Sequence, residues 1–212
     1  MKSTPTLYNR IAGQSPERLA ALSDGLFAIA MTLIVIDIRV PAAAAIHSEQ
    51  DLLDAFCRLS PRLLMYFMSF MTLGIFWVGQ QTQLNHLGKT DRNLSWIHLG
   101  FLAFVALMPF STALLAEFLE FRIALVVYWL NIFILGLMLL WGTIYTDRHG
   151  LLSEDPPPGF TKAVSRRILI AQALYALGAA LCLINTYWSI GFIVLVQLNY
   201  VIAPRIKPLF KL

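Results

Sequence analysis

An acidic side chain lies inside a long apolar stretch of this chain. Residues 18–40 read RLAALSDGLFAIAMTLIVIDIRV, with Ser23 and Asp24 near the first end and Asp37 near the last. About twenty such residues are enough to cross a bilayer as a helix. An ionisable group costs about 2.5 to 3.5 kcal/mol at the centre of such a helix and less toward its ends. Asp24 is therefore expected to have a partner or a function.

Two further polar side chains are predicted to lie at the same depth as Asp24. Trp77 and His98 stand about as far from the ends of their own apolar segments as Asp24 does from the end of its segment. Ser23, the ring N–H of His98 and the indole N–H of Trp77 can all donate hydrogen bonds to a carboxylate. This layer of polar side chains has two interpretations. It is either a structural clasp, in which hydrogen bonds hold the helices together, or a proton-sensing site, and we favour the clasp.

An aliphatic stripe follows Asp24 along the same segment. Ile29, Leu33 and Ile36 are spaced i, i+4 and i+7, so they form one line on a helix, with Asp24 nearly opposite and Thr32 beside the line. From the residues alone, such a stripe is more often lipid-facing or packed in a core than exposed to a pore.

The composition and the apolar segments predict an all-α membrane protein. The chain has 212 residues, of which 58% are hydrophobic and 13% charged, a balance typical of proteins with several membrane spans. Residues 1–17 are predicted to form an N-terminal tail in the cytoplasm and residues 18–212 a single six-span domain. Pro61 is expected to begin the second span, after a short amphipathic helix outside the bilayer within residues 41–60. The six predicted spans are about 18–40, 61–83, 94–115, 123–145, 168–184 and 188–203.

The basic residues predict the orientation of these spans. Six spans place both termini on one side, and twelve of the sixteen Lys and Arg residues then fall on the side of the termini. Cytoplasmic loops carry the excess of Lys and Arg in membrane proteins. We therefore expect both termini in the cytoplasm and a multi-pass protein of the cell (inner) membrane.

Several other classes of protein are disfavoured. Cys57 and Cys182 show no CxxC spacing and are predicted to be packing residues. No Gly-rich phosphate loop, HExxH motif or nucleophile elbow is present, so neither an enzyme nor a cofactor is expected. The basic residues lie at segment ends, which suits membrane topology better than nucleic-acid binding. The sequence contains no Thr-Val-Gly-Tyr-Gly motif, which forms the filter of conventional potassium channels, and no arginine ladder, which marks a voltage sensor.

The motif around Asp24 resembles that of a known family. Arg18-x-x-x-Leu22-Ser23-Asp24, followed by Gly-x-Phe-Ala-Ile-Ala-x-Thr, is similar to the signature of the transmembrane protein 175 family, whose motif is Arg-x-x-x-Phe-Ser-Asp. These proteins are lysosomal and prokaryotic potassium channels. Leu22 stands where the family has Phe, which removes aromatic packing and leaves the charges unchanged.

The resemblance implies an architecture and roles for the residues of the stripe. Prokaryotic members carry one six-span repeat, so it implies a homotetramer whose first helices line the pore. It places Ile29, Leu33 and Ile36 as the bulky residues that narrow the pore, and Thr32 as the polar contact for a passing potassium ion. A Phe-Trp pair similar to Phe76-Trp77 accompanies the motif, and it implies a structural network that includes Arg18, Ser23, Asp24, Trp77 and His98. Gln80-Gln81 stand where members often have a His pair.

The expected function is passive, potassium-selective conduction through a pore narrowed by aliphatic rings, with potassium ions, bilayer lipids and further copies of the chain as partners. The ion is expected to pass transiently and without a fixed metal site. The alternative is a proton-coupled secondary transporter of small solutes that uses Asp24 and His98. Such transporters favour internal repeats with interrupted helices, and none is visible in this sequence.

Overall fold

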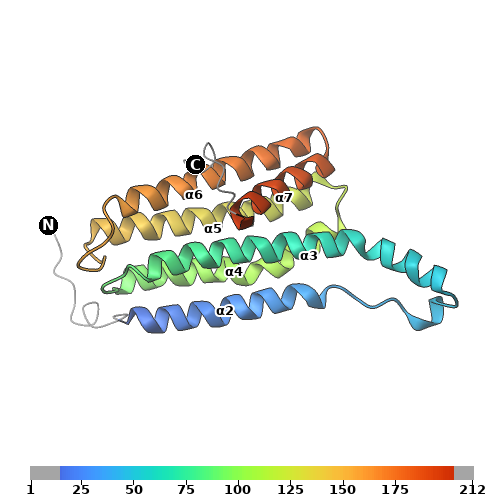
Figure 1. Ribbon diagram of the computed structural model, residues 1–212, viewed down its shortest axis with the longest axis horizontal. Coiled ribbons are helices and arrows are strands. Elements are labelled where there is room, and N and C mark those ends of the chain that lie inside the picture. Colours follow the sequence, from blue (N-terminus) through green and yellow to red (C-terminus); the bar gives the residue numbers. More distant parts are fainter. Residues whose placement is uncertain (1–14, 203–212) are drawn as a thin grey trace.

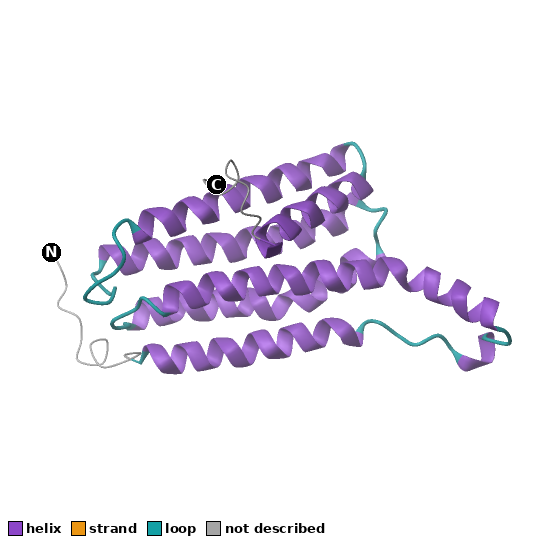
Figure 2. Ribbon diagram, viewed as in Figure 1, coloured by secondary structure: helices purple, strands orange, loops and turns teal. Residues whose placement is uncertain are grey.

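The computed structural model describes residues 15–202, which form helices joined by loops (Figures 1 and 2). Two short 3₁₀ helices, η1 (Ala43–Ala45) and η2 (Leu181–Leu183), accompany the long helices. The predicted all-α fold with six helical segments is confirmed within these residues. The long helices are α2 (Pro16–Ile36), α3 (Glu49–Leu84), α4 (Arg92–Glu117), α5 (Arg122–Arg148), α6 (Phe160–Ala180) and α7 (Thr186–Ile202).

Five of the helices, α2 to α6, are long and apolar enough to cross a membrane. The last, α7, has 17 residues. At about 1.5 Å per residue it is about 25 Å long, slightly shorter than a hydrocarbon core of about 30 Å. The sixth span was expected at 188–203, of which residue 203 lies outside the described residues.

The helix that contains the second predicted span begins before that span. The sequence predicted a separate amphipathic helix followed by a span that starts at Pro61, whereas α3 is continuous from Glu49 to Leu84 with Pro61 inside it. A proline inside a helix removes one backbone hydrogen bond and favours a bend without having to end the helix. The first part of α3 consequently projects beyond the bundle (Figure 1).

A reciprocal cap explains why α3 starts at Glu49. The Ser48 hydroxyl accepts from the Asp51 N–H at 3.1 Å, and the Asp51 carboxylate accepts from the His47 N–H at 3.1 Å. This pairing satisfies backbone donors that a helix start otherwise leaves open. Hydrogen bonds from Ser48 and His47 also hold the pKa of the Asp51 carboxyl below its ordinary value.

The helices pack in an order that separates the first helix from the last two. Helix α2 packs on α3 and α4, α4 packs on α5, α5 packs on α6, and α7 packs on α6 and α3. Figure 1 shows α2 along one long edge of the bundle and α6 along the other. One face of α2 is therefore exposed at the surface of the single chain.

A buried polar cluster joins four helices inside the bundle. The Tyr128 hydroxyl of α5 lies 3.2 Å from Ser69 Oγ and 3.1 Å from Thr72 Oγ1, both on α3. Thr112 of α4 donates to Ser69, and Gln197 of α7 donates to Thr72. Polar side chains bond across helices where no water is available. The cluster thus fixes how α3, α4, α5 and α7 meet.

The two cysteines have different environments. Cys182 is buried in the core, as expected of a packing residue, but Cys57 is exposed. The expectation for Cys57 was wrong because this residue belongs to the part of α3 that precedes Pro61.

Candidate ion pathway and its anchors

The two faces of α2 differ in burial. Its core-facing side consists of buried residues: Leu19, Ser23, Phe27, Ala30 and Ile34. On the other side, Ile29 is 57% exposed, Leu33 44% and Ile36 69%. The three stripe residues therefore lie on the face that none of the helices within residues 15–202 covers.

Thr32 supplies the polar group of this face. The residue is exposed, and its hydroxyl donates to the Ile29 carbonyl at 2.8 Å. A hydroxyl has one donor and two acceptor lone pairs. Because its donor is used within the helix, the oxygen presents acceptor capacity, which suits a cation.

The carboxylate of Asp24 ties α2 to α3. Trp77 Nε1 donates to Asp24 Oδ1 at 2.8 Å, and Gln81 Nε2 donates to the same oxygen at 2.6 Å. The sequence predicted contact with Trp77, but it missed Gln81 as a partner of Asp24. The available signal was spacing, because Gln81 follows Trp77 by four residues and so shares its helix face.

Two residues of the expected layer face elsewhere. Ser23 is fully buried, and its hydroxyl donates to the Leu19 carbonyl at 3.0 Å. His98 is buried, and its Nδ1 lies 3.1 Å from the Leu94 carbonyl. The expectation that both residues bond to Asp24 is therefore corrected. Ser23 points about 100° away from Asp24 around α2, since neighbouring helical residues differ by that angle.

Arg18, the fifth residue of the expected network, lies at the start of α2. Its backbone N–H donates to the Ser15 hydroxyl at 3.3 Å, which caps the helix, and its side chain is exposed. Pro16 follows this cap at the helix start, where its missing N–H costs no hydrogen bond. The beginning of α2 is thus well defined.

A second tether holds the last turn of α2. Arg62 of α3 donates through Nη1 to the Asp37 carbonyl at 3.4 Å, and its Nη2 lies 2.5 Å from Glu117 Oε2 of α4. The guanidinium therefore joins the end of α2 to both helices that support it. The sequence analysis assigned no role to Arg62.

Comparisons with known proteins support the resemblance. The family model described as "Endosomal/lysosomal potassium channel TMEM175" matches residues 18–109. "Potassium channel B446_29190" of Streptomyces collinus is 39% identical over 103 residues, which cover 49% of this chain and 48% of that protein. The match therefore spans about half the length of the Streptomyces protein.

Two further matches cover most of the chain. "Potassium channel Cha6605_3372" of Chamaesiphon minutus is 32% identical over 181 residues, covering 82% of this chain and 87% of that protein. The crystal structure titled as a lysosomal potassium-selective channel TMEM175 homolog from the same organism is 27% identical and matches with a TM-score of 0.75, covering 89% of this chain and 97% of that one. Sequence and fold agree, and we conclude that this chain is a multi-pass membrane protein that belongs to the TMEM175 family.

Proposed function

We propose that this protein is a potassium-selective channel that conducts ions passively along the exposed face of α2. The observation that carries the proposal is the burial pattern of α2, which anchors one side to α3 and α4 and leaves Ile29, Leu33 and Ile36 uncovered. The relatives named as potassium channels support it. The family is one of ion channels and not of enzymes, in agreement with the sequence.

A pore lined by α2 requires more than one copy of the chain. Helix α2 lies at an edge of the bundle, and its aliphatic face meets no other helix of the same chain (Figure 1). Several copies can close a pore only if these faces turn toward a common axis. We propose a homotetramer in the cell (inner) membrane with both termini in the cytoplasm, in line with the motif and with the positive charges near the span ends.

In this arrangement the stripe residues form stacked apolar collars. At about 1.5 Å per residue, Ile29 and Leu33 are about 6 Å apart along the axis, and Leu33 and Ile36 about 4.5 Å. An ion in a narrow apolar collar loses water without receiving replacement ligands, so dehydration sets the barrier. Sodium holds its water more strongly than potassium, so the barrier favours potassium. Thr32, between the collars, offers an oxygen to the partly dehydrated ion.

The two tethers keep the stripe facing one direction. Asp24 holds the first half of α2 through Trp77 and Gln81, and Arg62 holds its last turn. Rotation of α2 about its own axis breaks these bonds, because each fixes a different side of the helix. We assign Asp24 a structural role on this basis.

A flux assay separates the channel from the transporter alternative. The purified full chain, reconstituted in liposomes with a potassium gradient, is expected to set a reversal potential that follows the potassium gradient and does not shift with a pH gradient alone. A proton-coupled carrier gives the opposite result. A potential that follows pH and ignores potassium would overturn the proposed function.

A further inference from the structure

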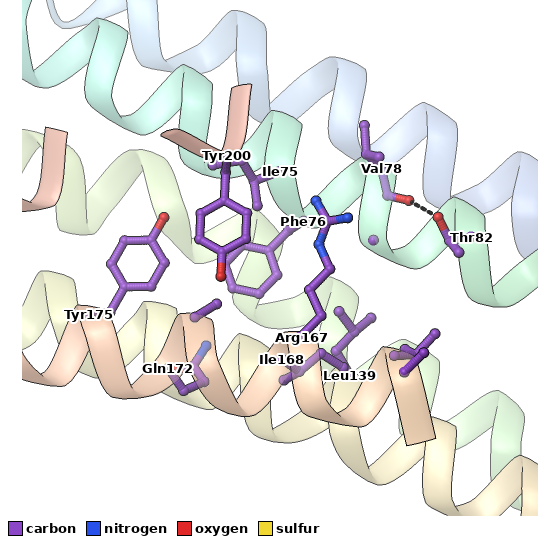
Figure 3. Close-up of a pocket in the computed structure, with 14 residues that line it drawn as sticks. Ile75, Phe76, Val78, Thr82, Leu139, Arg167, Ile168, Gln172, Tyr175 and Tyr200 are labelled. Carbon is purple, nitrogen blue, oxygen red and sulfur yellow. Dashed lines mark hydrogen bonds between the residues drawn. The ribbon is translucent and has the colours of Figure 1, made fainter. Parts of the chain in front are cut away.

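A cavity lies on the side of the bundle away from α2. It has a volume of about 260 Å³, is lined by residues of α3, α5, α6 and α7, and is partly open at the surface of the chain. Figure 3 shows Arg167 extending from α6 beside Tyr200 of α7 and Phe76 of α3, with Tyr175 further along α6. The proposed conduction pathway uses none of these residues.

The walls of this cavity are mostly apolar, and Arg167 is the one charged residue that lines it. Aliphatic and aromatic side chains line most of it, among them Ile75, Val78 and Ile168. Gln172 and Tyr175 also line the cavity, and the Tyr175 hydroxyl and the Gln172 side-chain oxygen are buried without a hydrogen-bond partner among the described residues. The polar lining residue Thr82 donates to its own helix, at the Val78 carbonyl (Figure 3).

Arg167 lines the cavity with its charge uncompensated by a carboxylate. Its guanidinium carbon lies 5.5 Å from the centre of the Tyr200 ring. Within residues 15–202 no Asp or Glu side chain forms an ion pair with Arg167. A cation–π contact leaves the outward N–H groups of a guanidinium free to bind an anion.

The depth of the cavity fits a lipid. Arg167 precedes the apolar part of α6, and Tyr175 lies eight residues further along, about 12 Å deeper at about 1.5 Å per residue. The charge therefore lies near the level of lipid phosphates, and the apolar space extends toward the bilayer interior. Basic pockets between membrane helices on the cytoplasmic side are known to bind anionic head groups.

We propose that this cavity is a binding site for an anionic phospholipid, with one acyl chain between α3, α6 and α7 and its phosphate on Arg167. A volume of about 260 Å³ is below the range of about 300 to 1,000 Å³ typical of drug-sized ligands, which limits the occupant to a single chain. The second chain remains in the bilayer. The surrounding membrane supplies this ligand at high concentration, whereas free fatty acid is scarce there.

Thermal unfolding of the purified, delipidated full chain tests the site. Phosphatidylglycerol is expected to raise the midpoint saturably, whereas phosphatidylcholine, oleate and inorganic phosphate are not. Arg167→Gln should weaken the apparent affinity for phosphatidylglycerol by about tenfold or more, because a charge-assisted hydrogen bond to phosphate is lost. Arg166→Gln is the matched control, since Arg166 is exposed like Arg167 and lies on the same helix turn but does not line the cavity.

A second variant tests the acyl chain independently of the charge. Ala171 lines the cavity, so Ala171→Phe should fill it and abolish the stabilisation by phosphatidylglycerol, with the midpoint in the absence of lipid preserved. Equal effects of Arg166→Gln and Arg167→Gln would indicate general surface attraction and overturn the site. Full stabilisation by phosphatidylcholine, by oleate or by phosphate alone would overturn the assigned ligand, and an unchanged response of Ala171→Phe would overturn the placement of the chain.

Discussion

At the scale of single residues, the carboxylate of Asp24 matters because one oxygen satisfies two donors. Trp77 Nε1 and Gln81 Nε2 both reach Oδ1, so removal of that oxygen leaves two donors of α3 without their partner. Water can replace part of this loss, because all three side chains retain some exposure in the single chain.

Asp24→Ala is expected to lower the free energy of unfolding by about 1 to 2 kcal/mol, after allowance for solvent screening at a partly exposed site. Asp24→Asn should lose less, because its amide keeps one acceptor oxygen. Thermal unfolding of the purified protein measures both. A wild-type midpoint in Asp24→Ala, together with altered ion selectivity, would place this carboxylate in the ion pathway.

The stripe residues are expected to control selectivity. Ile29→Asn or Ile36→Asn should raise conductance and lower the preference for potassium over sodium by about tenfold, or about 1.4 kcal/mol. The physical reason is that an amide oxygen replaces lost water for every cation. Bi-ionic reversal potentials of the reconstituted variants provide the measurement.

Two neighbouring positions serve as controls for the stripe. Val35 is 46% exposed but lies about 100° around the helix from Ile36, so Val35→Asn should leave selectivity unchanged. Ile34 is 3% exposed, and Ile34→Asn should mainly impair folding because it buries an amide. Unchanged selectivity in well-assembled Ile29→Asn and Ile36→Asn proteins would contradict the proposal that α2 lines the pore.

At the scale of elements, the contact between α5 and α6 depends on the absence of one side chain. A Cβ placed on Gly136 would clash with Nε2 and Cδ of Gln172. Gln172 fills this notch and donates to the Ile132 carbonyl at 3.4 Å. The two helices therefore meet through a glycine on one side and a buried amide on the other.

Gly136→Ala is expected to destabilise the fold by about 1 to 3 kcal/mol, because Gln172 must leave the notch or the helices must separate. The double variant Gly136→Ala/Gln172→Ala should recover part of this loss. Gly74→Ala is the control, since a Cβ there meets nothing within 4 Å, and alanine is the better helix former. Equal midpoints for Gly136→Ala and Gly74→Ala would contradict the close contact.

At the scale of the whole molecule, topology and assembly decide whether the α2 faces can meet. Helices α2 and α6 lie on opposite edges of the bundle (Figure 1), so α2 can approach an axis while the lipid site on α6 remains apart. This separation makes the proposed pore and the proposed lipid site independently testable.

Reporter fusions and native mass measurement check this arrangement. Fusions after Lys211 and within residues 147–161 should report cytoplasm, and a fusion near Ser48 should report the outside. The purified channel should have the mass of four chains. A C-terminal fusion that reports the outside would contradict the proposed topology. A monomer that conducts potassium would contradict a pore shared between copies of the chain.

The sequence alone determined the properties that depend on position along the chain. Hydrophobic segments predicted the all-α fold, and the fixed rise of a helix placed Asp24 and Trp77 at one depth, where they form a 2.8 Å hydrogen bond. Helical periodicity placed Ile29, Leu33 and Ile36 on one face, and all three are exposed together. These features follow from the local geometry of one helix, which the order of residues fixes.

Only the tertiary structure decided the properties that depend on how two helices are rotated against each other. Depth grouped Ser23 and His98 with Asp24, but packing turned both toward backbone carbonyls and brought Gln81 to the carboxylate instead. Pro61 likewise remained inside α3, because the cap at Ser48 starts that helix a full twelve residues earlier than its apolar part. The rotation of a helix is set by the sum of its contacts with several neighbours, and no single segment of sequence contains that sum.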